Sequence, residues 1–495
     1  MFTTGFDNEL YIRLQSEKIR ERISAFGGKL YLEFGGKLFD DYHASRVLPG
    51  FKPDSKLQML MTLKEEAEIV IVINAYDIEK NKMRGDLGIT YDADVLRLID
   101  AFRLAGFYVG SVVLTQYSSQ PAATAFSARL EKLGIKVFHH YSIDGYPDDV
   151  KAIVSENGYG RNEYIETSRS LVIVTAPGPG SGKMAVCMSQ LYHDNARGVS
   201  AGYAKFETFP VWNLPLKHPV NIAYESATVD LGDVNMIDHY HFDAYGVMAV
   251  NYNRDIEIYP VMNAIFEKIY GKSPYKSPTD MGVNMAGYCI IDDEVVKEAA
   301  RKEIIRRFYT CACAERKGLI DDHSQTARCE LLMRQAGATI ESRLVVNAAL
   351  EKERLTGAPA AAIELNDGRI IVGKTTSLLG ASSAMLLNAL KALAGVDDGI
   401  QLIAQKYIEP IQQLKVNILG NTNPRLHMDE VLVALCICAS TDENAAKCVE
   451  QLKNLKHCEA HSSVILSQVD ENIYRKLGIN LTCEPVYQTK KLYHK

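Results

Sequence analysis

The sequence predicts an α/β protein of several domains, with a doubly wound, mostly parallel sheet in its N-terminal portion. Short apolar, β-branched runs alternate with helical patterns from the start of the chain to about residue 200. This alternation is typical of a parallel sheet covered by helices on both faces. A glycine-rich, P-loop-like turn follows one of the predicted strands, and such turns lead into helices in anion-binding α/β proteins. The length of 495 residues allows about three domains.

The predicted elements of this sheet follow one another in order. A helix is expected over residues 8–26 and a first strand over 29–36. A polar helix near 55–66 precedes residues 68–74, whose unbroken apolar run is typical of a strand buried on both faces. The remaining elements are helices at 92–105, 121–133 and 147–156, and strands at 107–115, 135–139 and 171–175.

Three regions are expected along the chain. Residues 1–235 form an N-terminal α/β domain, residues 236–356 a mixed and mainly helical middle region, and residues 357–495 a smaller C-terminal α/β domain. The charged helical pattern of residues 293–356 would add surface without an obvious core. We therefore also expect a homo-oligomer.

Composition narrows the class of protein. The net charge of −6 argues against a protein built to bind nucleic acid. Ten cysteines are scattered along the chain, which favours reduced thiols in the cytosol over a disulfide framework. No apolar run approaches the ~20 residues that cross a bilayer, and the first residues lack a signal-peptide pattern. We expect a cytoplasmic protein with neither nucleic acid nor membrane as a partner.

The glycine-rich turn after the strand at 171–175 predicts a phosphate site. Small residues let backbone N–H groups turn inward, and the first N–H groups of the following helix point to the same place. A lysine at the rim adds a positive charge for a phosphate oxygen. The predicted binding residues are Gly178, Gly180, Ser181, Gly182 and Lys183.

The match to the phosphate-binding pattern G-x-x-x-x-G-K-[ST] is imperfect. Pro177 stands at the first glycine position, and Met184 stands where a hydroxyl would ligate Mg²⁺. The loop also follows the fifth predicted strand, whereas typical P-loop proteins place it after the first. The glycine spacing differs from the dinucleotide pattern G-x-G-x-x-G as well. The alternative is an ordinary strand-to-helix turn with an exposed lysine.

A second segment, residues 368–375, satisfies the same pattern letter for letter. Its interior residues Ile370, Ile371 and Val372 are β-branched and favour a strand over a loop with free N–H groups. The Asn-Asp-Gly sequence before it is typical of a hairpin turn. We therefore predict a returning hairpin strand, so the pattern match is due to chance.

Polar or glycine-containing segments follow the predicted strands, where ligands of parallel sheets bind. Asp77 comes just after the strand at 68–74 and is a candidate partner for a metal ion. Arg84 and Asp86 lie in the next glycine-bearing loop and could neutralise charge or position an acceptor. These three residues are the candidate catalytic residues. The alternative is that strand ends are polar because loops are exposed.

No metal site is predicted. The Asp- and His-rich stretch at 230–243 has no recognised ligand spacing. Cys311 and Cys313 form one CxC pair without a second pair, which is a weak zinc signal. We interpret them as small buried residues on helices.

Several long segments resemble a bacterial family of cytosolic proteins catalogued as a domain of unknown function. They are residues 5–9, 30–50, 82–91, 177–183 and 373–384. The resemblance extends along essentially the whole chain. It implies an N-terminal α/β portion, a helical middle and a separate C-terminal α/β portion, and it implies no reaction.

We expect a protein that binds a nucleotide or another small phosphate-containing metabolite, with a kinase-like phosphotransferase as one form of it. The cofactor is left open, and a nucleoside triphosphate with Mg²⁺ is one candidate. The alternative is a non-enzymatic protein that senses or scaffolds, binding an anion without turnover.

Overall fold

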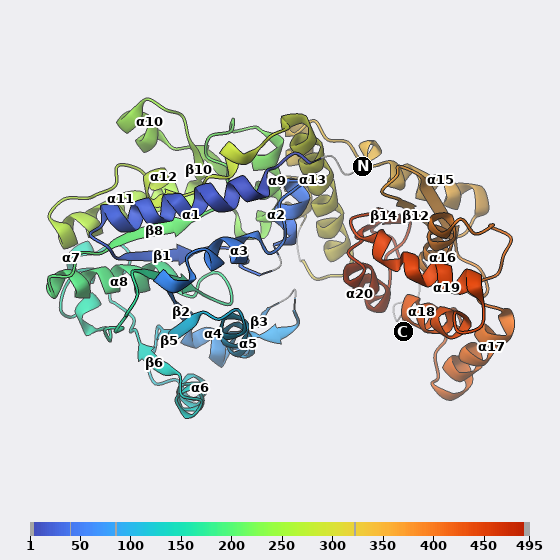
Figure 1. Ribbon diagram of the computed structural model, residues 1–495, viewed down its shortest axis with the longest axis horizontal. Coiled ribbons are helices and arrows are strands. Elements are labelled where there is room, and N and C mark those ends of the chain that lie inside the picture. Colours follow the sequence, from blue (N-terminus) through green and yellow to red (C-terminus); the bar gives the residue numbers. More distant parts are fainter. Residues whose placement is uncertain (1–3, 40, 85–86, 321–322, 490–495) are drawn as a thin grey trace. The chain divides into compact units, whose positions relative to one another are not determined.

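Seven strands form one sheet in the order β11-β8-β1-β7-β2-β5-β6. Figure 1 labels β8, β1, β2, β5 and β6 of this sheet. Each neighbouring pair in this sheet is parallel. This confirms the α/β class and the mostly parallel N-terminal sheet. The strands are β1 (Leu30–Phe34), β2 (Ala67–Asn74), β5 (Tyr108–Thr115), β6 (Lys136–His139), β7 (Leu171–Thr175), β8 (Gly202–Phe206) and β11 (Gly282–Val283).

The computed structural model describes residues 4–39, 41–84, 87–320 and 323–489. The chain divides into two compact units. The N-terminal unit contains residues 4–225 and 232–299, and the C-terminal unit contains residues 226–231 and the chain from residue 300. Among the described helices, none combines the length and the apolar character that crossing a bilayer requires.

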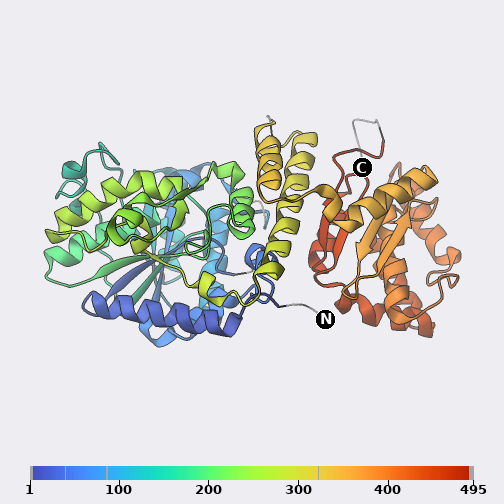
Figure 2. The same ribbon diagram turned by 90° about the horizontal axis from the view of Figure 1, so that it is seen from above.

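Helices cover both faces of the seven-stranded sheet because its connections run in two directions. β1, β2 and β5 are each followed by a strand nearer the β6 edge, whereas β6, β7 and β8 are each followed by one nearer the β11 edge. Right-handed crossovers place these two sets of connections on opposite faces. Figure 2 shows α1 (dark blue, Asn8–Ala25) and α11 (yellow-green, Asn253–Tyr270) on opposite sides of the sheet.

The strands are apolar because both faces are covered. Seven consecutive residues of β2 are buried, as the unbroken apolar run predicts. On one face, Tyr31, Val172 and Tyr203 pack against Val186 of α8 and Phe266 of α11. The other helices of this unit are α2 (Tyr42–Val47), α3 (Ser55–Met61), α4 (Ala75–Glu79), α5 (Tyr91–Leu104), α6 (Pro121–Lys132), α7 (Val150–Ile153), α8 (Lys183–Ala196), α9 (Pro219–Ala227), α10 (His239–Tyr245) and α12 (Pro278–Met281).

Two small strand pairs accompany the main sheet. β3 (Met83–Arg84) and β4 (Ile89–Thr90) form one antiparallel pair, and β9 (Asn235–Ile237) and β10 (Val250–Tyr252) form the other. Helix α13 (Asp293–Arg316) begins in the N-terminal unit and ends in the C-terminal unit.

The C-terminal unit is built on a four-stranded sheet in the order β13-β12-β14-β15. β12 (Ala360–Glu364) is antiparallel to both β13 (Ile370–Lys374) and β14 (Glu459–Ser462), and β14 is parallel to β15 (Asn480–Cys483). The hairpin predicted at residues 368–375 is confirmed, since Ile371 pairs with Ile363. The helices of the C-terminal unit are α14 (Ser324–Gln335), α15 (Leu344–Thr356), α16 (Ala381–Ala394), α17 (Gln405–Gln413), α18 (Met428–Cys438), α19 (Glu443–Glu450) and α20 (Gln468–Lys476).

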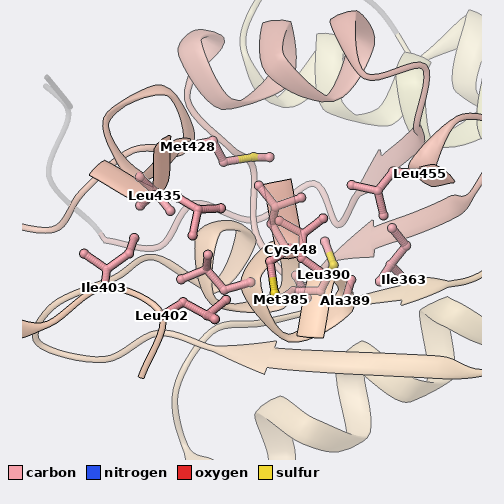
Figure 3. Packing of buried hydrophobic residues seen from close by; sticks show 14 of the residues in the cluster. Ile363, Met385, Ala389, Leu390, Leu402, Ile403, Met428, Leu435, Cys448 and Leu455 are labelled. Atoms are coloured by element: carbon pink, nitrogen blue, oxygen red, sulfur yellow. The ribbon is translucent and has the colours of Figure 1, made fainter. Parts of the chain in front are cut away.

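The core of this unit lies between its sheet and its later helices. Met385 and Leu390 of α16 pack with Ile363 of β12 and Leu435 of α18 (Figure 3). All four side chains are fully buried. The small residues of α16 let it lie close to β13, where a Cβ at Gly373 would come within 2.2 Å of the Met385 nitrogen.

Arg343, just before α15, carries a guanidinium group that is buried in this unit with only 1% of the side chain exposed. Its Nε and Nη2 atoms donate to Glu459 Oε2 at 3.0 and 2.7 Å. Nη2 also donates to the carbonyl oxygens of Ala460 and Asn480. One side chain therefore ties the segment before α15 to the paired strands β14 and β15.

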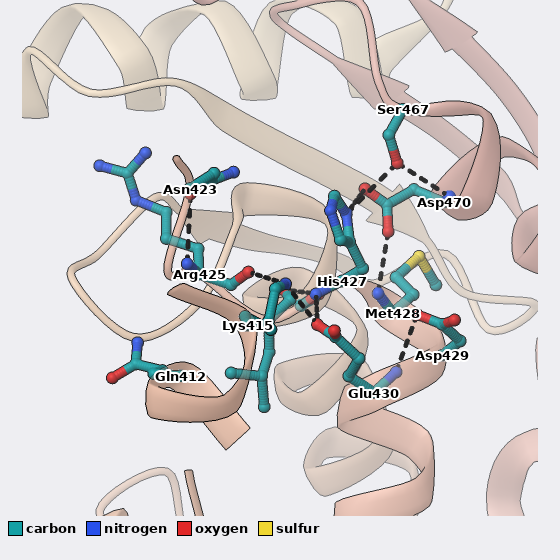
Figure 4. Close-up of polar contacts among 12 residues, drawn as sticks. Gln412, Lys415, Asn423, Arg425, His427, Met428, Asp429, Glu430, Ser467 and Asp470 are labelled. Atoms are coloured by element: carbon teal, nitrogen blue, oxygen red, sulfur yellow. Dashed lines mark hydrogen bonds and ion pairs between the residues drawn. The ribbon is translucent and has the colours of Figure 1, made fainter. Parts of the chain in front are cut away.

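His427 joins the starts of α18 and α20 (Figure 4). Its Nδ1 lies 3.5 Å from Asp470 Oδ2 and 3.3 Å from Ser467 Oγ. The other carboxylate oxygen of Asp470 accepts from the Met428 N–H at 2.8 Å. The hydrogen bond with the Asp470 carboxylate raises the pKa of His427 above its ordinary value, although burial opposes the shift.

The raised pKa of His427 predicts a pH-dependent contact between α18 and α20. The protonated imidazolium stabilises the folded state fully below the unfolded pKa of about 6.5, and this contribution is lost as the pH rises through the folded pKa. We expect amide protection of α18 and α20 in hydrogen exchange, corrected for intrinsic rates, to fall as the pH rises from about 6.5. His427→Gln should make that protection independent of pH. An equal fall in the variant would contradict the assignment.

Candidate functional site

The glycine loop, residues 176–182 between β7 and α8, lies where the connections between strands change direction along the sheet. β7 stands between β1 and β2, and its outgoing connection runs the opposite way from theirs. In open α/β sheets, ligands bind at such a point, beyond the carboxyl ends of the strands. The sequence predicted the loop, and the topology places it at the usual position for a ligand.

The loop is held in shape by its own backbone and by one side chain of β5. Gly180 and Gly182 have φ angles of 75° and 88°, a left-handed region that favours glycine. The buried Ser181 donates from Oγ to the Gly178 carbonyl at 2.8 Å. Its own carbonyl accepts from Thr115 Oγ1 at 2.7 Å. These contacts fix the direction in which the loop enters α8.

The start of α8 presents free hydrogen-bond donors. Gly182 is the residue before the helix, and the Val186 N–H closes the first helical turn onto its carbonyl at 3.0 Å. Within the described part of the chain, the N–H groups of Lys183, Met184 and Ala185 have no acceptor. Lys183 also forms no ion pair with any residue that the structure describes. One charged group and three backbone donors therefore meet at one helix end.

The ends of β2 and β5 contact the glycine loop, as expected for a site of converging loops. Asn74 Nδ2 lies 3.5 Å from the Gly180 carbonyl and 3.2 Å from Gln116 Oε1. Its Oδ1 accepts from the Tyr76 N–H at 2.9 Å and so begins α4. The end of β6 differs, since His139 and His140 interact with Glu163.

The three candidate catalytic residues lie in and after α4. Asp77 pairs with Lys82 Nζ at 3.2 Å. Arg84 pairs with the buried Asp94 at 2.8 Å. Asp86 lies outside the described residues. Ion pairs thus hold Asp77 and Arg84, and their catalytic role stays a prediction.

Two residues that the sequence reasoning did not single out connect this region to the glycine loop. The Tyr91 ring lies against Gly178, where a Cβ atom would come within 2.2 Å of the Tyr91 hydroxyl. Lys82 Nζ lies 4.9 Å from the centre of the Tyr91 ring. A chain of contacts therefore runs from Gly178 through Tyr91 and Lys82 to Asp77. Both residues lie in one of the segments that resemble the family, but no motif assigns them a role.

Met184 is partly buried. Its side chain packs against the buried cluster between the sheet and α8, which includes Val186 and Met188. The residue that departs from the phosphate-binding pattern therefore has a packing role. A metal ion at this loop would need ligands from elsewhere, such as phosphate oxygens and water.

Gly178 should not tolerate alanine. The new methyl group would overlap the Tyr91 ring, so we expect Gly178→Ala to destabilise the N-terminal unit by about 1–3 kcal/mol, the range for overpacking. Urea unfolding followed by the fluorescence of Trp212, the single tryptophan, measures this. Gly35→Ala is the control, because its Cβ would make only an ordinary contact of 3.6 Å with the Phe206 carbonyl. Equal stability of the two variants would contradict the packing argument.

Fold and site together define an α/β protein with a strand, a glycine loop and a helix N-terminus at the switch point of a parallel sheet. The chain belongs to the family described as domain of unknown function DUF1846. The N-terminal family model matches residues 4–337 and the C-terminal model matches residues 341–493. This confirms the resemblance found in the sequence.

Relatives of full length are similar to this chain. A UPF0371 protein of Corynebacterium efficiens is 58% identical over 493 residues, which cover 99% of each chain. One of Corynebacterium diphtheriae is 58% identical over 494 residues, covering 100% of this chain and 99% of the relative. A UPF0371 protein of Streptococcus pyogenes serotype M5 is 56% identical over 495 residues and covers all of both chains.

Proposed function

We propose that this protein binds a small phosphate-containing molecule, a nucleotide or a phosphorylated metabolite, at the glycine loop. The observation that carries the proposal is the set of donors at the start of α8. Three N–H groups and the Lys183 ammonium have no partner among the described residues, and they lie at the ligand position of the sheet. A phosphate group supplies the negative charge and the acceptor oxygens that these donors need.

The contacts behind the loop support this proposal. Thr115, Ser181 and Asn74 hold the loop from the side of β2 and β5. The donors therefore keep their direction without the ligand, and binding does not have to order the loop first. Lys82, half-exposed beside Tyr91, provides a second positive charge on the Gly178 side of the loop.

A kinase-like phosphotransferase is the enzymatic form of the proposal. Phosphoryl transfer depends mainly on positioning and on charge stabilisation, which Lys183 and Lys82 could supply. Asp77 would then have to exchange Lys82 for a metal ion or an acceptor group. Binding without turnover is the alternative, and the ion pair of Asp77 with Lys82 is compatible with it.

A thermal-shift panel tests the proposal. Wild type and Lys183→Ala are heated with inorganic phosphate, ATP, GTP and sugar phosphates, each with and without Mg²⁺. A ligand at 100 times its Kd should stabilise wild type by about 2.7 kcal/mol, and the variant should respond less. If no compound shifts wild type more than the variant, the glycine loop is not a phosphate site. Release or transfer of phosphate from the compounds that bind then separates an enzyme from a sensor.

A further inference from the structure

A second polar cluster lies at the carboxyl edge of the same sheet. Lys205 of β8 places its Nζ 3.0 Å from Glu207 Oε1 and also pairs with Asp255 of α11. Glu33 of β1 accepts a hydrogen bond from the Tyr203 hydroxyl at 2.7 Å. We call Glu33, Lys205, Glu207 and Asp255 the Lys205 cluster.

The strands that carry Glu33 and Lys205 lie beside the strand that leads into the glycine loop. Glu33 stands opposite Val174 of β7 on one side and opposite Lys205 on the other. β8 is therefore two strand spacings, about 10 Å, from the strand that leads into the loop. Cys187, one turn after Lys183 on α8, lies close enough to both Glu33 and Lys183 for their charges to act on it. Burial raises the pKa of the Cys187 thiol.

The cluster carries more hydrogen-bond acceptors than its one lysine can occupy. Three carboxylates surround one ammonium group, and an ionised carboxylate only accepts hydrogen bonds. The side chains of Lys205, Glu207 and Asp255 keep 18, 11 and 15% of their surface exposed, whereas Glu33 is buried. Carboxylate acceptors beside a cationic donor match vicinal hydroxyl groups, each of which donates one hydrogen bond and can accept up to two.

A buried hydroxyl beside α8 also lacks a partner. Tyr159 is 1% exposed, and its hydroxyl has no hydrogen-bond partner among the described residues. It packs in the same buried cluster as Cys187. A buried polar atom of this kind is normally satisfied, and a ligand hydroxyl or a water between α8 and the sheet would satisfy it.

We propose that the Lys205 cluster is the hydroxyl-binding half of the site and that the ligand is a phosphorylated polyhydroxy compound, of the sugar-phosphate class. The proposal rests on the proposed function, since the glycine loop holds the phosphate. The carboxylates of Glu33, Glu207 and Asp255 accept bonds from the ligand hydroxyls, and Lys205 donates to their oxygens. Strand β7, which leads into the glycine loop, and strand β8, which carries Lys205, are about two strand spacings apart, so we expect one small molecule to span both halves.

Two probes with the same phosphate and the same six-carbon chain test the proposal. Sorbitol 6-phosphate carries hydroxyl groups, and n-hexyl phosphate does not. Calorimetry on wild type should show sorbitol 6-phosphate binding about tenfold tighter or more, the effect of one charge-assisted hydrogen bond. Glu207→Gln should bring the ratio of the two affinities close to one. Glu267→Gln, on the exposed side of α11, should leave the ratio as it is in wild type.

The outcomes separate the two proposals. If neither probe binds wild type, both the phosphate site and the hydroxyl site are wrong. If both probes bind equally, and Lys183→Ala weakens both, the phosphate site stands and the hydroxyl-binding half is wrong. A ratio that survives Glu207→Gln and also Asp255→Asn overturns the assignment of the cluster.

The pH dependence of the affinity ratio in the wild-type protein also tests the proposal, in case Glu207→Gln does not fold. Burial raises the pKa of Glu207 to about 7, with Lys205 opposing and Asp255 adding to the shift. Other titratable groups that interact with the cluster include Glu33, Tyr203, Tyr224 and Tyr252. Protonation removes one acceptor oxygen, so the ratio between the probes should fall from pH 8 to pH 6. A ratio that stays constant over this range overturns the role of Glu207.

Discussion

Lys183→Ala should weaken the binding of inorganic phosphate, or of any phosphate compound that the thermal-shift panel identifies, by about 10- to 150-fold. This corresponds to about 1.5–3 kcal/mol, the range for a hydrogen bond to a charged group. The lysine begins α8 and forms no ion pair with a described residue, so its loss removes a ligand contact and breaks no ion pair. Isothermal calorimetry measures the change.

Lys374→Ala is the matched control for this experiment. Lys374, like Lys183, follows a glycine, but it precedes a threonine, in the segment that fits the phosphate-binding pattern letter for letter. It is exposed at the end of β13, where Ala360 of β12 pairs with it. The variant should bind phosphate as wild type does. Loss of binding in Lys374→Ala with no change in Lys183→Ala would show that the C-terminal segment is the true site.

Arg343→Met should destabilise the C-terminal unit by about 3–5 kcal/mol, because the largely buried Glu459 carboxylate loses its ion-pair partner. Burial alone would raise the pKa of Glu459, but the charges of Arg343 and Arg306 hold it below its ordinary value. Without Arg343, Glu459 Oε2 and the carbonyls of Ala460 and Asn480 lose the bonds that the guanidinium donates, whereas Glu459 Oε1 still accepts from Asn480 Nδ2 at 2.8 Å. Methionine keeps the apolar volume of the side chain.

The measurement has to report on the C-terminal unit itself. Trp212 lies in the N-terminal unit, so tryptophan fluorescence does not follow this change. Native-state hydrogen exchange of β14 and β15 amides gives the free energy of local opening. Arg369→Ala, which removes an exposed pair with Asp367, should leave it essentially unchanged. Adding Glu459→Gln to Arg343→Met should recover part of the loss.

The sequence alone predicts those strands whose own residues form a recognisable pattern. β2 and β7 are unbroken β-branched runs, and a strand buried on both faces needs such a run. The hairpin of β12 and β13 was found from its turn residues. β8 was not predicted, because Lys205 interrupts a short run with small residues, and β11 has only two residues.

The candidate site was predictable only where one segment carries it. The glycine loop combines strand, turn and helix within a few residues, so its pattern is visible in the sequence. The contact of Tyr91 with Gly178 and the pairing of Lys205 with Asp255 join distant segments. These contacts depend on the strand order and on the register between β1, β7 and β8, which no local pattern determines.

The hydrogen bonds that hold the glycine loop from behind have a kinetic consequence. Thr115 and Ser181 fix the loop through bonds that do not involve the ligand. Capture of a phosphate then requires no slow rearrangement, and the observed association rate should rise linearly with ligand concentration instead of reaching a plateau. Differences in affinity among ligands would therefore arise chiefly from how long each one stays bound.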